Sequence, residues 1–158
     1  MQLEADYVAA LGDVRSFEVI GEGDGLLLSG GQTPLSYVAQ RQTPLEGTAW
    51  VVDGIAIGDD AVSSTVGGSE AELTFDTGRV SGSTGCNRLT GSYTVDVTEG
   101  SISFAQIATT KQLCEPDVAA QEQAILAAID AAASYSIEGS TMTLSDAAGS
   151  FLLSFAGR

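Results

Sequence analysis

The sequence contains no histidine, a single lysine and only two cysteines. Without histidine the chain lacks the commonest general base, the usual partner of a catalytic serine or cysteine, and the commonest zinc ligand. Two cysteines are too few for a four-thiolate metal site. We therefore expect no catalytic residues, no cofactor and no metal site. Catalysis by a pair of carboxylates, which only geometry would reveal, stays open.

Positively charged residues are scarce as well. Six lysines and arginines stand against 21 acidic residues, which gives a net charge of −15 at pH 7. Nucleic acids and anionic lipids bind basic surfaces, so neither is expected as a partner. Solubility or adaptation to salt explains such acidity. Calcium binding is the alternative, but the D-x-[DN]-x-[DN]-G loop is absent and only Asp59-Asp60 would support it.

Long apolar runs are missing too. No run approaches the roughly 18–20 residues that a membrane span needs, so we expect no transmembrane segment. The first ten residues, MQLEADYVAA, contain no basic region followed by an apolar one, so we expect no signal sequence within them. Apolar residues nevertheless make up 44 % of the 158 residues. That content is enough for one folded domain with a core, and the length is too short for two of average size.

The chain contains an internal repeat, in which residues 4–38 align with residues 122–155 mostly at a fixed offset, with a two-residue slip around the GEGDG segment that later recovers. Each copy has the pattern of a helix followed by three strands. A duplication explains this better than convergence of patterns. The segment Gly21-x-Gly23-x-Gly25 resembles a nucleotide-binding fingerprint, but it falls between two expected strands, so we interpret it as a hairpin turn. Matched positions include Glu4 with Glu122, Leu26 with Met142, Leu28 with Leu144, and Leu35-Ser36-Tyr37 with Leu153-Ser154-Phe155.

Upstream of the second helix the pattern is all strand. We therefore predict an α+β fold, a small antiparallel and strongly curved sheet or cracked β-barrel with one main helix. Its half-copy, a helix plus three strands, precedes it. The predicted organisation is a half-domain at 1–38, a linker at 39–44 and a complete domain at 45–158. The predicted strands are 48–53, 72–76, 79–83, 92–97 and 101–104.

Several short motifs follow one another through the complete domain: Leu45-Glu46-Gly47-Thr48-x-Trp50, Leu73-x-Phe75-Asp76, Arg79-Val80-x-Gly82, Gly85-Cys86-Asn87, Gly91-x-Tyr93, Ile107-Ala108-x-Thr110 and Cys114. In this order they resemble the META domain (HslJ-like) family. The resemblance implies a small barrel-like sheet with one helix. It also implies a bacterial cell-envelope protein, periplasmic or lipid-anchored and often a lipoprotein, with a link to heat shock, envelope stress or secretion and no defined activity.

The motif residues have physical roles that are structural. Gly85 and Gly91 bracket a tight crossing that needs positive φ or close backbone approach. Asn87 can hydrogen-bond nearby backbone in the same turn, and Thr110 can do so in the approach to the helix. We interpret the signature as structural rather than ligand-binding, at Trp50, Gly85, Asn87, Gly91, Tyr93 and Thr110.

The two cysteines, Cys86 and Cys114, have three possible states. A structural disulfide would close a loop of about 29 residues, stabilise the fold by roughly 3–4 kcal/mol and suit an envelope compartment. A redox role would draw on the positive charge of Arg88 and Lys111 and on a helix N-terminus beside Cys114. Two buried free thiols packed close together are the third state.

These observations predict a non-enzymatic envelope protein that serves as a binding or scaffold module for an unknown protein or lipid partner. One alternative is a carrier of lipid or another apolar ligand in a hollow barrel. Another is a redox or carboxylate-based enzyme. A half-domain would also leave an unpaired sheet edge and an exposed apolar face, so we expect residues 1–38 to dock on the full domain or to mediate self-association.

Overall fold

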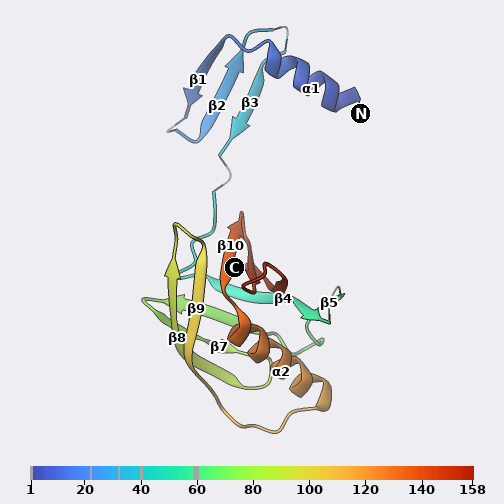
Figure 1. The fold of residues 1–158 in the computed structure, drawn as a ribbon, viewed down its shortest axis with the longest axis vertical. Helices are drawn as coiled ribbons and strands as arrows, with labels where there is room; N and C mark the ends of the chain where they lie inside the picture. Colours follow the sequence, from blue (N-terminus) through green and yellow to red (C-terminus); the bar gives the residue numbers. More distant parts are fainter. Residues whose placement is uncertain (1, 22, 32, 40, 59–60) are drawn as a thin grey trace. The chain divides into compact units, whose positions relative to one another are not determined.

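The computed structural model describes residues 2–21, 23–31, 33–39, 41–58 and 61–158 (Figure 1). Those residues form two compact units, residues 1–41 and residues 42–158. The division between the units lies within the stretch 39–44 that the sequence indicates as a linker.

The N-terminal unit is a helix followed by a three-stranded antiparallel sheet in the order β1-β2-β3 (Figure 1). The interpretation of the glycine-rich segment as a hairpin turn is confirmed, because Ile20 pairs with Gly25 across it and Gly21 and Gly23 both have positive φ. The elements are α1 (Gln2–Gly12), β1 (Ser16–Ile20), β2 (Gly25–Ser29) and β3 (Leu35–Val38).

The C-terminal unit is a single curved antiparallel sheet with one helix, as the predicted fold class requires (Figure 1). The strands follow the order β12-β11-β10-β9-β8-β7-β6-β4-β5, and β12 also pairs with β4, so hydrogen bonding runs round a ring. The strand pairing in the ring is shortest between β9 and β10, which pair only at Ser101 and Ser134. The elements are β4 (Ala49–Ile57), β5 (Ala61–Ser63), β6 (Glu72–Asp76), β7 (Arg79–Ser83), β8 (Arg88–Asp96), β9 (Ser101–Thr109), α2 (Pro116–Ala131), β10 (Ser134–Glu138), β11 (Thr141–Ser145) and β12 (Phe151–Gly157).

The interior of the ring is packed with large apolar side chains. Alternate residues of β6, β11 and β12 point inward, as the pleat requires, and α2 adds Ile125 and Ile129 to the same cluster. The hollow-barrel prediction is therefore wrong for the residues that the structure describes, because side chains occupy the space that an acyl chain would need. The interior includes Trp50, Leu73, Phe75, Leu89, Met142, Leu144, Leu153 and Phe155, all with 0 % exposure.

Helix α2 begins where the sequence indicates it. Pro116 occupies its first turn, where the missing N–H costs nothing, and Asp117 places a negative charge at the positive end of the helix. Its interior is rich in alanine, which favours helix. The buried residues of α2 include Gln121, a polar residue, so part of its inner face meets polar groups rather than the apolar core. No helix in the described residues is long and apolar enough to cross a membrane.

Candidate functional site

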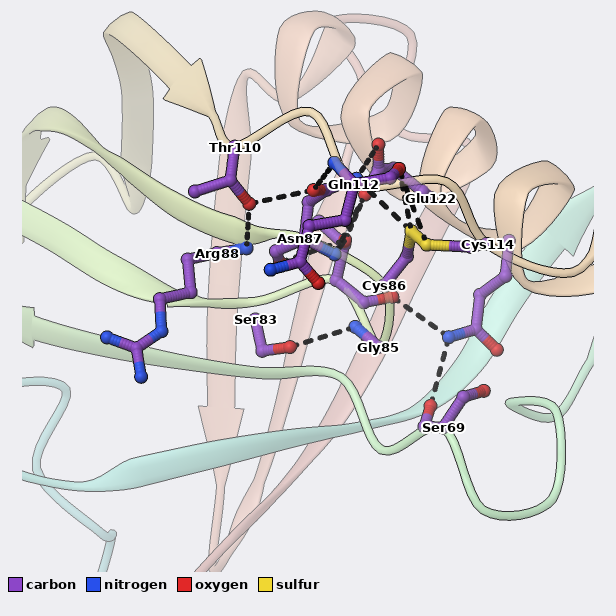
Figure 2. The surroundings of a disulfide bond; sticks show 12 residues. Ser69, Ser83, Gly85, Cys86, Asn87, Arg88, Thr110, Gln112, Cys114 and Glu122 are labelled. Atoms are coloured by element: carbon purple, nitrogen blue, oxygen red, sulfur yellow. Dashed lines mark hydrogen bonds between the residues drawn. A yellow bond between two sulfur atoms is a disulfide. The ribbon is translucent and has the colours of Figure 1, made fainter.

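Cys86 and Cys114 form a disulfide, with their Cα atoms 6.0 Å apart (Figure 2). Of the three states that the sequence leaves open, this is the one that the structure has, and neither cysteine is a free thiol. The bond joins the turn between β7 and β8 to the segment that leads into α2. It therefore cross-links two parts of the chain 28 residues apart in sequence.

Asn87 is the centre of a polar cluster beside the disulfide (Figure 2). Its Oδ1 atom accepts hydrogen bonds from the Thr110 hydroxyl at 2.7 Å and from the Gln112 backbone N–H at 2.8 Å. Its Nδ2 atom donates to Glu122 Oε1 at 3.1 Å and to Cys86 Sγ at 3.1 Å. Asn87 is 4 % exposed. One side chain thus ties together the β7–β8 turn, the segment before α2, and α2 itself.

Glu122 connects α2 to that turn through its other oxygen. Oε2 accepts from the Thr84 hydroxyl at 2.5 Å and from the Asn87 backbone N–H at 3.2 Å. With the Asn87 amide, the carboxylate accepts three hydrogen bonds in a partly buried site, where bonds to a charged acceptor are stronger than neutral ones. Thr84 has 0 % exposure, so its hydroxyl is not available to a ligand.

Gln121, next to Glu122 on α2, explains why the signature needs a glycine at position 85. Its Oε1 accepts from the Val66 backbone N–H at 2.6 Å, and its Nε2 donates to the carbonyl oxygens of Ser69 at 3.1 Å and Thr84 at 3.0 Å. A Cβ atom on Gly85 would lie 2.5 Å from Gln121 Nε2 and 2.6 Å from the Ser69 oxygen. Gly85 also has a φ of +90°, which other residues rarely adopt.

The other signature residues lie elsewhere in the domain. A Cβ on Gly91 would lie 2.5 Å from Ile107 Cδ1, so glycine permits the close approach of β8 and β9. Trp50 belongs to the apolar core and donates from its indole N–H to the Leu45 carbonyl at 2.9 Å. The structure therefore brings five of the sequence-predicted residues together, and Trp50, Gly91 and Tyr93 are placed apart from them. The five are Gly85, Cys86, Asn87, Thr110 and Cys114.

Tyr93 is a core residue with one polar contact. Its ring packs edge-on against Phe75, with ring centroids 5.0 Å apart, and its hydroxyl donates to Glu46 Oε1 at 2.5 Å. Burial, followed by the hydrogen bond to Glu46, raises the pKa of Tyr93 to about 12. The phenol therefore stays protonated and acts as a donor at neutral pH.

The polar cluster around Asn87 has a structural role, because its groups hold neighbouring elements together. No group of three potential metal ligands occurs among the described residues, and the carboxylates at 59 and 60 suggested for calcium lie outside that part of the chain. The amide, hydroxyl and carboxylate groups bond to one another and to backbone. Sequence reasoning identified Asn87 and Thr110 but missed Gln112, Gln121 and Glu122 as members. The match of Glu122 to Glu4 in the repeat was the one available signal.

The outer surface carries shallow grooves. One of about 630 Å³ lies over β7, β8 and β9 and is lined mainly by polar residues. Among the signature residues, Gly91 lines it. Gln106, also in its lining, has a φ of 55°, an uncommon value for a residue with a side chain. The other polar lining residues are Asp76, Arg79, Ser81, Thr90 and Ser92.

Comparison with solved structures finds the same fold in two NMR structures of low sequence identity. A protein from Burkholderia xenovorans solved by NMR is 26 % identical, with a TM-score of 0.62 over 72 % of this chain and 83 % of that one. A second NMR structure is 19 % identical, with a TM-score of 0.50 over 70 % of this chain and 89 % of that one. A DUF4847 family protein from Bacteroides vulgatus is 18 % identical, with a TM-score of 0.45 over 54 % of this chain and 57 % of that one.

No curated protein matches the chain. The signature, the curved sheet with its single helix, and the polar cluster beside the disulfide all lie in the C-terminal unit. The META domain model matches residues 43–157, and the chain therefore belongs to the META domain family.

Proposed function

We propose that this chain is a non-enzymatic META module of the bacterial cell envelope, periplasmic or lipid-anchored, which serves as a scaffold or binding unit in envelope stress or secretion. The family and the disulfide support an extracytoplasmic protein, because structural disulfides persist in oxidising compartments. The acidic surface is compatible with a protein partner and unfavourable for nucleic acid.

The hydrogen bonding of the signature residues is the observation that carries this proposal. Asn87 uses both ends of its amide within the cluster, and the Glu122 carboxylate accepts three bonds from neighbours. An active site would instead leave a nucleophile or base directed at a substrate. The polar groups of this cluster are therefore occupied in holding α2, the β7–β8 turn and the segment before α2 together.

Because the interior of the ring is packed with side chains, a ligand or partner would have to bind on the outer surface. The groove over β7, β8 and β9 offers both a cation, Arg79, and an anion, Asp76, together with hydroxyl and amide side chains. Such a mixed polar surface suits a protein partner better than a fatty acyl chain. We therefore assign binding to this groove.

The test is site-specific photo-crosslinking of the chain exported to the periplasm. A photo-reactive residue at Thr90, exposed in the groove, is expected to give a discrete protein adduct. The same residue at Val97, which is 78 % exposed but outside the groove, serves as the matched control. Equal adducts at the two positions, or none at either, would contradict a binding role for the groove.

A second measurement separates the binding module from a redox enzyme. A thiol-exchange enzyme lacking one cysteine traps its substrate as a mixed disulfide on the other. We expect Cys114→Ser to trap no protein on Cys86, while the Thr90 crosslink persists in the same variant. A mixed disulfide on Cys86 would replace this proposal with a redox function.

A further inference from the structure

The strands of the N-terminal unit repeat the final strands of the C-terminal unit with the same register. Phe17 pairs with Leu28 as Tyr135 pairs with Leu144, and the other pairs on this face correspond in the same way. These side chains lie on one face of each sheet because they are cross-strand partners or alternate along a strand. The remaining correspondences are Val19 and Leu26 with Ile137 and Met142, Leu26 and Tyr37 with Met142 and Phe155, and Leu28 and Leu35 with Leu144 and Leu153.

Matched side chains differ sharply in burial. Met142, Leu144, Leu153 and Phe155 have 0 % exposure, because strands β4–β9 cover them with residues such as Trp50, Leu73 and Phe75. Their counterparts Leu26, Leu28, Leu35 and Tyr37 are only half-buried in the N-terminal unit. Phe17 is 73 % and Val19 is 58 % exposed, whereas their counterparts Tyr135 and Ile137 are half-buried. Helix α1 contacts the sheet through a 2.7 Å hydrogen bond between the hydroxyls of Tyr7 and Tyr37. An apolar face of this kind on a folded unit marks an interaction surface.

A polar position in the repeat points to what covers this face. Glu122, on α2, accepts its hydrogen bonds from Thr84 and Asn87, which belong to the turn between β7 and β8. Its repeat partner is Glu4 on α1, which is exposed. Residues 1–41 contain no counterpart of the Thr84–Asn87 turn. The N-terminal unit thus retains the carboxylate that binds this turn, without the turn.

We propose that the apolar face of residues 4–38 docks a META first half. By this we mean a polypeptide segment with the strands of β4–β9 and a threonine and asparagine turn like residues 84–87. Its inward apolar side chains cover Phe17, Val19 and Leu26, and its turn donates hydrogen bonds to Glu4. Its first strand pairs with the free edge of β3, as β4 pairs with β12 in the C-terminal unit. The surface is thus a specific acceptor for one class of partner.

Strands β4–β9 of the same chain do not fill this role. Strands β4 and β6–β9 are already closed against β10–β12, because β9 pairs with β10 and β12 pairs with β4 in the ring. A second copy of the N-terminal unit offers another apolar face, but neither the missing strands nor the threonine and asparagine donors. A first half from outside these residues satisfies both the apolar and the polar observation.

The test uses the intact chain, labelled with ¹⁵N, and an unlabelled probe polypeptide of residues 42–113 carrying Cys86→Ser. The probe is used after it recovers buried Trp50 fluorescence with a polypeptide of residues 114–158. We expect 1:1 binding, with amide shifts confined to residues 4–38. Phe17→Asp is expected to weaken binding at least 100-fold, and Glu4→Gln about 10-fold. Because Phe17 is 73 % exposed, its replacement leaves the free unit folded, which its own spectrum checks.

Val97→Asp, an equally exposed apolar position in the C-terminal unit, is the matched control and should bind the probe unchanged. A competent probe that leaves the signals of residues 4–38 unmoved would overturn the proposal. So would shifts confined to residues 43–157, which report exchange of the chain's own first half. Shifts of residues 4–38 on concentrating the chain alone would show that a second copy is the occupant instead.

Fusing residues 42–113 ahead of Gln2 gives a second arrangement that needs no bimolecular step. The fusion is expected to contain two buried tryptophans and a protected amide core within residues 4–38. One solvent-exposed tryptophan in the fused segment, with residues 4–38 unprotected from hydrogen exchange, would count against the proposal as directly as a failed titration.

Discussion

The N-terminal unit, α1–β3, and the α2–β12 half of the C-terminal unit have the same elements in the same order with the same strand register. One half has its apolar face exposed or half-buried, and the other forms the core of a packed ring. Local sequence and hairpin pairing are therefore sufficient to define the strands and their register, while burial depends on the strands that cover them.

The largest difference is expected at the matched aromatic positions Phe155 and Tyr37. Phe155→Ala empties a fully buried site and should lower the free energy of unfolding of the C-terminal unit by about 3–5 kcal/mol. Tyr37→Ala removes a half-buried ring and should cost its own unit at most about 1.5 kcal/mol, since there is little cavity to create. Denaturant unfolding followed by Trp50 fluorescence reports on the C-terminal unit, and amide hydrogen exchange reports on the N-terminal unit. Equal losses would show that the N-terminal face is covered.

The disulfide should stabilise one unit and leave the other unaffected. The double variant Cys86→Ser, Cys114→Ser is expected to lose about 3 kcal/mol, because the cross-link no longer restricts the unfolded chain. Thermal unfolding of the C-terminal unit measures the loss. Amide exchange of residues 4–38, which contain no cysteine, is the internal control and should not change. A variant as stable as the parent would mean that the polar cluster alone holds the β7–β8 turn.

The matched glutamates give a smaller and more selective contrast. Glu122→Leu removes one charged acceptor from the Thr84 hydroxyl, the Asn87 N–H and the Asn87 amide, which should cost about 2 kcal/mol. Glu4→Leu changes an exposed side chain and should alter stability by no more than about 0.5 kcal/mol. Chemical denaturation of the two variants side by side measures both. A loss in Glu4→Leu as large as in Glu122→Leu would reveal a partner for Glu4 in the free chain.

Hairpins and glycine-marked turns were the most predictable parts of the fold. The turn at Asp76-Thr77-Gly78 joins β6 to β7 as the sequence indicates, with positive φ at both Thr77 and Gly78. Strand β9 was predicted to end at 104 but continues to Thr109. Its pairing with β8 passes a register shift between Thr90 and Ser92, where the alternation of apolar residues is lost and local pattern no longer indicates a strand.

The parts of the fold and of the polar cluster that the sequence does not predict depend on long-range contacts. The pairing of β12 with β4 closes the ring over about a hundred residues, and no local pattern encodes it. The signature showed Asn87 and Thr110 because both lie in motifs. Gln121 and Glu122 resemble the solvated residues of any polar helix face, and only the approach of α2 to the β7–β8 turn makes them part of the cluster. The same limit applies to the interior, whose filled state depends on side chains from every strand.

The smallest effect is confined to alkaline pH and compares two hydrogen-bonded tyrosines. Burial and the Glu46 bond hold the pKa of Tyr93 at about 12, above its ordinary value of about 10. Because the folded state keeps this proton longer than the unfolded state, its contribution is complete below pH 10 and is lost as pH rises towards 12. The free energy of unfolding of the C-terminal unit should therefore fall over that interval, and Tyr93→Phe should reduce the slope of this free energy against pH. The hydrogen bond between the Tyr37 and Tyr7 hydroxyls also raises the pKa of Tyr37, but that residue lies in the other unit, so Tyr37→Phe should leave the slope unchanged. Urea unfolding of the parent and both variants at several pH values from 9 to 12 measures this, with near-UV absorbance following tyrosine ionisation. If Tyr93→Phe and the parent fall in parallel, Tyr93 ionises at its ordinary pKa and the buried bond to Glu46 is not maintained in solution.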